Sequence, residues 1–94
     1  MERQEFDNVW EALEDDPAMV ATLTAKSLLL LEIRGKVEQW NISQTEAAKR
    51  LGITQPRLND LLQGKINKFS LDALMKLATD AGLKVNLQVE KAAA

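Results

Sequence analysis

Apolar residues recur at a helical period through the first half of the chain. The positions that fall close to a 3.6-residue repeat are Met19, Val20, Leu23, Leu30, Ile33, Val37 and Trp40. Just before them, the Asp15–Asp16 pair supplies an N-cap residue and Pro17 fits a first helical turn. The pattern predicts a helix over about residues 17–40. Gly35 lies inside this helix at a cost of about 1 kcal/mol relative to Ala, so we expect it to mark close packing against another helix.

Two short helices are predicted next, joined by a three-residue turn. Ser43 and Glu46 form a capping box, in which the first residue caps a helix and the fourth reaches back to it. That helix ends at Gly52, and Thr54 is the N-cap of the second. Two short helices around a turn that contains glycine are typical of a helix-turn-helix over residues 44–63.

A last helix is predicted after a short loop. The second helix of the pair runs to about Gln63, and Gly64 ends it, as glycine commonly does after a helix. Ser70 is then the N-cap of a helix over about residues 71–81, which Gly82 closes.

The period changes to two over residues 83–90, where apolar and polar residues alternate without exception. This alternation predicts a half-buried β-strand. A single strand cannot satisfy its own backbone, so it must pair with a second segment, either residues 3–10 or the same strand of another copy. We favour pairing across a two-fold axis, which makes Val85, Leu87 and Val89 the dimerisation residues.

Composition narrows the class of protein. The 94 residues are 46% hydrophobic and 28% charged, typical of one globular domain over residues 1–94. The longest apolar run, residues 28–31, is too short to span a membrane, and residues 1–5 do not begin a signal peptide. The chain has no Cys and no His, which argues against an enzyme, a metal site and a disulfide framework. We therefore expect a cytoplasmic, non-catalytic protein without cofactors.

Charge is divided unevenly along the chain. Residues 1–40 carry nine acids and four bases, whereas residues 41–94 carry five acids and eight bases. The acidic N-terminal segment, residues 1–16, alone carries seven acids and one base. This division favours two different partners or faces, although helices with solvated charges would give the same numbers.

The stretch from Gln44 to Leu74 resembles the helix-turn-helix of the lambda-repressor/Cro-type (XRE) family. The similarity rests on the segments 44–48, 52–58, 61–65 and 69–74. The segment Asn8–Leu13, the long helix and the C-terminal strand are most similar to the HigA-type antitoxins of that family. The resemblance implies an all-α, lambda-repressor-like bundle of about five helices with one short C-terminal β-strand. It also implies double-stranded DNA as a partner.

In this family geometry the second helix lies in the major groove, with its N-terminal residues at base edges. Gln55 and Asn59 have the amide geometry to contact adenine, and Arg57 can reach guanine or a phosphate. Gln44 can bind a phosphate at the start of the first helix. Asp60 is a departure, because phosphates would repel it. The predicted DNA-binding residues are Gln44, Thr54, Gln55, Pro56, Arg57, Asn59, Gln63, Lys65 and Lys68.

These observations predict a homodimeric, sequence-specific transcriptional repressor that binds a palindromic operator. By resemblance it is the antitoxin of a type II toxin–antitoxin pair that represses its own operon. Its partner would then be a basic, mRNA-cutting toxin of the RelE superfamily, which the acidic segment suits. Two alternatives remain open: a phage or mobile-element regulator without a toxin partner, and a protein-interaction module that has lost its DNA affinity.

Overall fold

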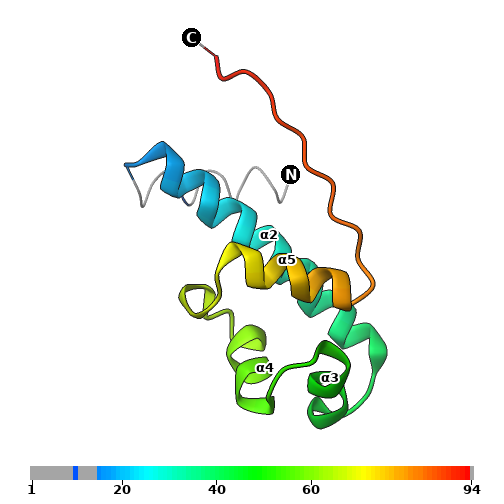
Figure 1. Ribbon diagram of the computed structural model, residues 1–94. Coiled ribbons are helices and arrows are strands. Elements are labelled where there is room, and N and C mark those ends of the chain that lie inside the picture. Colours follow the sequence, from blue (N-terminus) through cyan, green and yellow to red (C-terminus); the bar gives the residue numbers. More distant parts are fainter. Residues whose placement is uncertain (1–9, 11–14, 94) are drawn as a thin grey trace.

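The computed structural model describes Trp10 and residues 15–93, which form a small bundle of helices with an extended C-terminal tail (Figure 1). The elements in chain order are α2 (Pro17–Trp40), α3 (Gln44–Leu51), α4 (Gln55–Leu62), the 3₁₀ turn η1 (Ile66–Lys68) and α5 (Leu71–Asp80). Helix α5 lies alongside the middle of α2, and α3 and α4 lie beside each other near the C-terminal end of α2. The long helix α2 is thus the support on which the shorter helices assemble.

Each helix begins at the polar side chain that the sequence predicts. Asp16 Oδ1 accepts a hydrogen bond from the Ala18 amide at 3.0 Å. The Ser43 and Ser70 hydroxyls each accept one from an amide three residues later, at 3.1 Å. The Thr54 hydroxyl caps α4 in the same way, at 3.3 Å from the Arg57 amide. Because such a cap is worth about 1 kcal/mol, these four local signals place the helix starts, and the four predicted helices are confirmed to within two residues.

Left-handed backbone conformations end two of the helices. Asn41 has a φ of 51° after α2, and Gly52 has a φ of 67° after α3. Glycine adopts this conformation at no steric cost, which is why it closes the turn between α3 and α4. Gly35 behaves differently, because a Cβ added there would meet no described atom within 4 Å beyond its chain neighbours and the adjacent backbone of α2 itself. The expectation that Gly35 marks close helix packing is therefore wrong.

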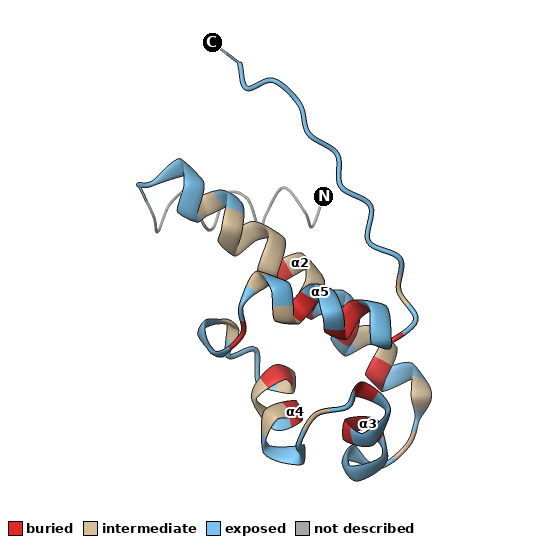
Figure 2. Cartoon of the chain, viewed as in Figure 1, coloured by how far each residue is buried: buried red, intermediate tan, exposed pale blue. Residues whose placement is uncertain are grey.

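The core lies where all four helices meet (Figure 2). Ile33 of α2, Leu58 and Leu61 of α4 and Leu74 of α5 are completely buried, and Phe69 is 1% exposed. Each buried leucine or phenylalanine contributes roughly 2–3 kcal/mol relative to an exposed one. Since short helices are unstable in isolation, this shared core is what holds α3 and α4 in a fixed relative orientation.

Two details of the predicted architecture are not seen in the described residues. The described residues contain four α-helices and one 3₁₀ turn, so a five-helix bundle is not seen in them. The predicted strand over residues 83–90 is also not formed, and this segment is an extended tail whose first residues border α2 and α5. The physical reason is that a strand needs a neighbour that pairs with its backbone, and no other described segment forms backbone hydrogen bonds with residues 84–90. The alternative pairing partner, residues 3–10, falls almost entirely outside the described residues.

Candidate nucleic-acid interface

The turn between α3 and α4 is locked by backbone hydrogen bonds and small side chains. The Gly52 amide donates to the Lys49 carbonyl oxygen at 3.1 Å, and the Ile53 amide donates to Ala48 O at 3.0 Å. Ala47 and Ala48 are 1% and 3% exposed, and their small size lets α4 approach α3 closely. The two helices and the turn predicted over residues 44–63 are therefore present and packed against each other.

Helix α4 has one buried and one open side. Leu58 and Leu61 face the core, whereas Gln55, Asn59 and Gln63 are exposed. Of the nine residues predicted to bind DNA, the structure leaves eight on the surface, and Arg57 alone is half-buried. The exposed ones are Gln44, Thr54, Gln55, Pro56, Asn59, Gln63, Lys65 and Lys68.

The Gln55 side chain is held in position by α3. The Thr45 hydroxyl lies 3.2 Å from Gln55 Oε1 and donates a hydrogen bond to it. A carboxamide oxygen has two lone pairs, so Gln55 keeps one acceptor site and both Nε2 hydrogens for a ligand. Sequence reasoning missed Thr45, because the residue lies next to the capping box and nothing in the local pattern shows which way its side chain points.

Arg57 is tied to the loop that follows α4. Its guanidinium carbon lies 4.3 Å from the centroid of the Phe69 ring, and Nη1 donates to the Lys68 carbonyl oxygen at 3.0 Å. This cation–π contact and the hydrogen bond use one face of the guanidinium and one of its five N–H groups. Arg57 therefore joins the start of α4 to η1, a role that the sequence pattern does not indicate.

The acidic residue on α4 has a basic neighbour. The Asp60 carboxylate lies 3.5 Å from Lys65 Nζ, and the Asp60 carbonyl oxygen accepts from the Lys65 amide at 3.0 Å. The Asp60 side chain is only 23% exposed, against 47% for Lys65. Lys65 therefore screens the negative charge of Asp60 that would otherwise repel a phosphate. The unfavourable position of Asp60 on a DNA-binding helix is thus offset by a neighbouring cation.

The surface around α3 and α4 is moderately basic. Residues 41–68 carry five bases and two acids. Lys49 and Arg50 are exposed at the end of α3, where the Arg50 guanidinium lies 5.0 Å from the centroid of the Trp40 ring. The excess of positive charge is suited to binding a polyanion. The exposed amide side chains beside it can form hydrogen bonds with polar groups that lie between the negative charges of that polyanion.

Residues 12–90 of the chain match a protein family whose description is "Helix-turn-helix domain". The match covers most of the chain and includes α2, α3, α4 and α5. No curated protein matches the sequence. Within the described residues, none of the helices has the length and apolar character needed to cross a membrane.

Proposed function

The chain belongs to the helix-turn-helix family, and on this premise we propose that it is a sequence-specific DNA-binding repressor of transcription. The observation that carries the proposal is the exposed amide row of α4, in a pair of packed helices flanked by basic side chains. Helices of this kind enter the major groove, where amide side chains read base edges.

The contacts divide into base reading and phosphate binding. Gln55 and Asn59 contact bases, because each can donate one hydrogen bond to adenine and accept one from it. Gln44 at the start of α3 and Lys68 after α4 contact phosphates on either side. Arg57 contacts a phosphate with the N–H groups that Lys68 O leaves free. Thr54, Pro56, Gln63 and Lys65 complete the DNA-binding face.

The functional unit is a homodimer on a palindromic operator. One copy has a net charge of −2 and a modest basic face, so its affinity for DNA is low on its own. A two-fold axis places two copies of α4 about 34–36 Å apart, one turn of DNA. Val85, Leu87 and Val89 supply the dimer contacts, since all three are exposed apolar side chains in the single chain.

The biological role that fits best is that of an antitoxin, in which the acidic segment of residues 1–16 binds a basic, RNA-cutting toxin of the RelE superfamily. This segment carries six more acids than bases. A small basic reading frame next to the gene, whose product co-purifies with this chain, would support the role. A chain that regulates its own gene without such a neighbour would be a phage or mobile-element regulator.

The deciding experiment is fluorescence anisotropy with DNA from upstream of the chain's own gene, titrated across salt concentrations. We expect competitor-resistant binding whose log K falls linearly with log salt. Gln55→Ala should weaken operator binding about 10- to 100-fold and leave binding to random DNA unchanged. Gln39→Ala, a matched change at an exposed position of α2, should leave both unchanged.

If the wild-type chain binds the DNA from upstream of its gene no more tightly than it binds random DNA, the proposal is overturned. It would favour the protein-interaction module instead, a hypothesis that the net charge of −2 supports.

A further inference from the structure

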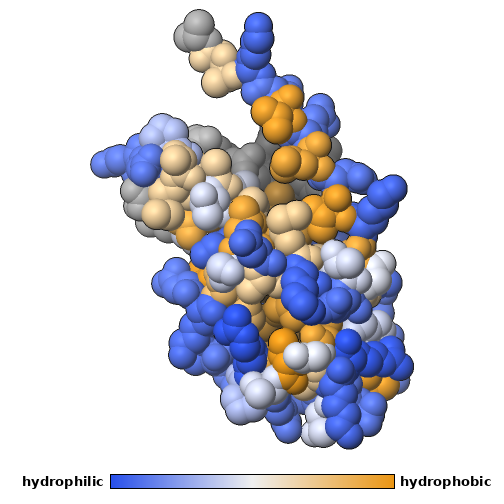
Figure 3. Space-filling model, in the orientation of Figure 1, coloured by the Kyte–Doolittle hydropathy of each residue, from blue (hydrophilic) through white to orange (hydrophobic). Residues whose placement is uncertain are grey.

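The C-terminal tail carries the most exposed apolar side chains among the described residues. Leu87 is 88% exposed and Val89 is 84% exposed, whereas Leu83, at the root of the tail, packs against the core. Figure 3 shows apolar side chains along the tail that continue onto the body of the molecule. Burying two such residues gains roughly 1.5–3 kcal/mol each relative to exposure, so a partner surface that covers them would stabilise the tail.

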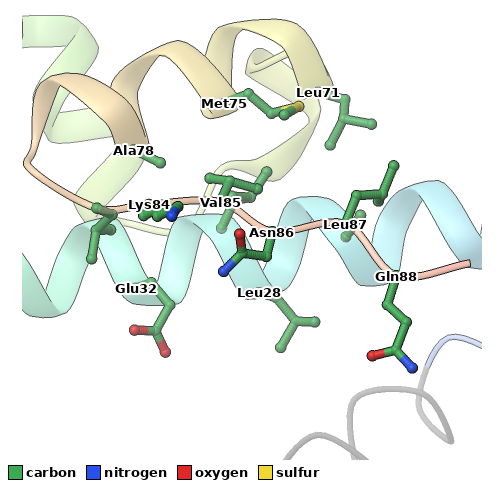
Figure 4. Close-up of a pocket in the computed structure, with 13 residues that line it drawn as sticks. Leu28, Glu32, Leu71, Met75, Ala78, Lys84, Val85, Asn86, Leu87 and Gln88 are labelled. Atoms are coloured by element: carbon green, nitrogen blue, oxygen red, sulfur yellow. The ribbon is translucent and has the colours of Figure 1, made fainter.

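An apolar groove lies between the tail and the bundle. It has a volume of about 460 Å³ and is bordered by α2, α5 and residues 83–88. Val85 and Leu87 lie on the side of Leu71 and Met75, and Asn86 and Gln88 point the other way (Figure 4). The tail therefore already separates its apolar side from its polar side, as a strand in a two-stranded ribbon does.

The tail backbone is unpaired as well. The Leu83 amide donates to Ala78 O at 2.9 Å, and beyond it residues 84–93 make no backbone–backbone hydrogen bond to any described residue. The segment is extended, alternates in polarity and has free donors and acceptors along its length. Such a segment is a template for pairing with another strand.

We propose that the tail and groove bind the tail of a second copy of this chain, antiparallel and in a register centred on Leu87. The proposal rests on the homodimer put forward above and specifies its interface. Residues 84–90 of the two copies pair, Leu87 lies opposite the partner's Leu87, and the apolar side of the ribbon covers Leu71 and Met75 of each copy.

The alternation of apolar and polar positions in the tail, together with its charges, favours this register. In any register centred on a residue, odd positions pair with odd ones, so the apolar sides of both tails stay together. Centring on Leu87 also places Lys84 opposite the partner's Glu90, twice by symmetry, and Asn86 opposite the partner's Gln88. Opposite charges directly across an antiparallel pair are stabilising.

The neighbouring registers lose this complementarity. Centring on Asn86 places Glu90 opposite the partner's Gly82 and leaves Lys84 opposite the partner's Gln88. Centring on Gln88 places Glu90 opposite the partner's Asn86 and Lys84 opposite the partner's Ala92, so no cation faces an anion. Only the register centred on Leu87 pairs apolar with apolar and cation with anion, and it is the one expected to form.

Single-cysteine cross-linking tests the register directly, because the chain contains no cysteine. Residues directly opposite each other have Cα atoms about 4.5–5.5 Å apart, within disulfide range, whereas diagonal neighbours lie about 7–8 Å apart. Leu87→Cys should therefore form a covalent dimer on mild oxidation, and Asn86→Cys and Gln88→Cys should do so at least tenfold more slowly. Faster cross-linking of either control, or none by any of the three variants, would overturn the proposed register.

Charge reversal provides an independent test. Lys84→Glu and Glu90→Lys should each weaken dimerisation about tenfold, since each turns two attractive pairs into repulsive ones. Mixing the two variants should restore a tight heterodimer, in which every cross-strand pair again has opposite signs. Lys91→Glu, an equal change of charge outside the paired residues, should leave dimerisation unchanged. Failure of the mixed variants to associate would contradict the pairing.

These outcomes are separable from the fate of the proposed function. If the Leu87→Cys variant cross-links but the chain does not bind DNA, the proposed interface stands and the proposed repressor function fails. If the chain binds operator DNA as a monomer, the proposed function stands and the proposed interface fails. The same conclusion follows if both charge variants dimerise with unchanged affinity.

Discussion

Helix α4 and the C-terminal tail have equally regular sequence patterns and opposite structural outcomes. Residues 55–62 form a helix whose apolar side is completely buried at Leu58 and Leu61. Residues 83–90 alternate without exception, yet Leu87 and Val89 are exposed and the strand is absent. The difference is the location of the partner: α4 packs against elements of its own chain, whereas no segment within residues 15–93 pairs with the backbone of the tail.

The largest expected effect on stability comes from a substitution on the buried side of α4. Leu61→Ala removes a completely buried side chain and should lower the free energy of unfolding by about 2–5 kcal/mol. Leu87→Ala is the matched change in the tail and should lower it by less than about 0.5 kcal/mol at concentrations where the chain is monomeric. Urea denaturation measures both, and equal losses would show that the tail packs as tightly as the core.

A second prediction concerns association of the tail. Leu87→Asp places a charge on its apolar side and should weaken the homodimer at least about 30-fold, because two carboxylates would be buried in one ribbon. Light scattering should then show monomers. Gln88→Asp adds the same charge on the polar side and should leave the dimer largely intact. A dimeric Leu87→Asp variant would move the interface to the helices.

A third prediction concerns the basic residue that joins α4 to its loop. Arg57→Ala should weaken DNA binding about tenfold for operator and random DNA alike, and should reduce the salt slope by about one, as loss of one phosphate contact does. Salt-dependent anisotropy measures both quantities. A loss confined to one base pair of the operator would instead assign base reading to Arg57, and a control denaturation curve would exclude unfolding.

The smallest expected effect lies away from both regions. Gly35→Ala should stabilise the chain by about 0.5–1 kcal/mol, since the position is inside α2 and a Cβ there would contact no other described element within 4 Å. Thermal unfolding measures the gain. Destabilisation would mean that something packs against this face, and DNA affinity should stay unchanged in either case.

Local chemistry made much of the fold predictable. The bounds of α2, the capping residues Ser43, Thr54 and Ser70 and the turn at Gly52 depend on hydrogen bonds and dihedral angles within a few residues. Most of the predicted DNA-binding residues lie on the surface for a related reason: once Leu58 and Leu61 are buried, the helical period determines which positions face outward.

The contacts between distant residues were decided by the tertiary structure alone. The hydrogen bond from Thr45 to Gln55, the stacking of Arg57 on Phe69 and the groove beside the tail each join residues ten or more positions apart. The sequence alone also could not determine whether the alternating segment forms a strand. A helix closes its hydrogen bonds within itself, but a strand closes them with a neighbour, and none of the residues that the structure describes supplies one.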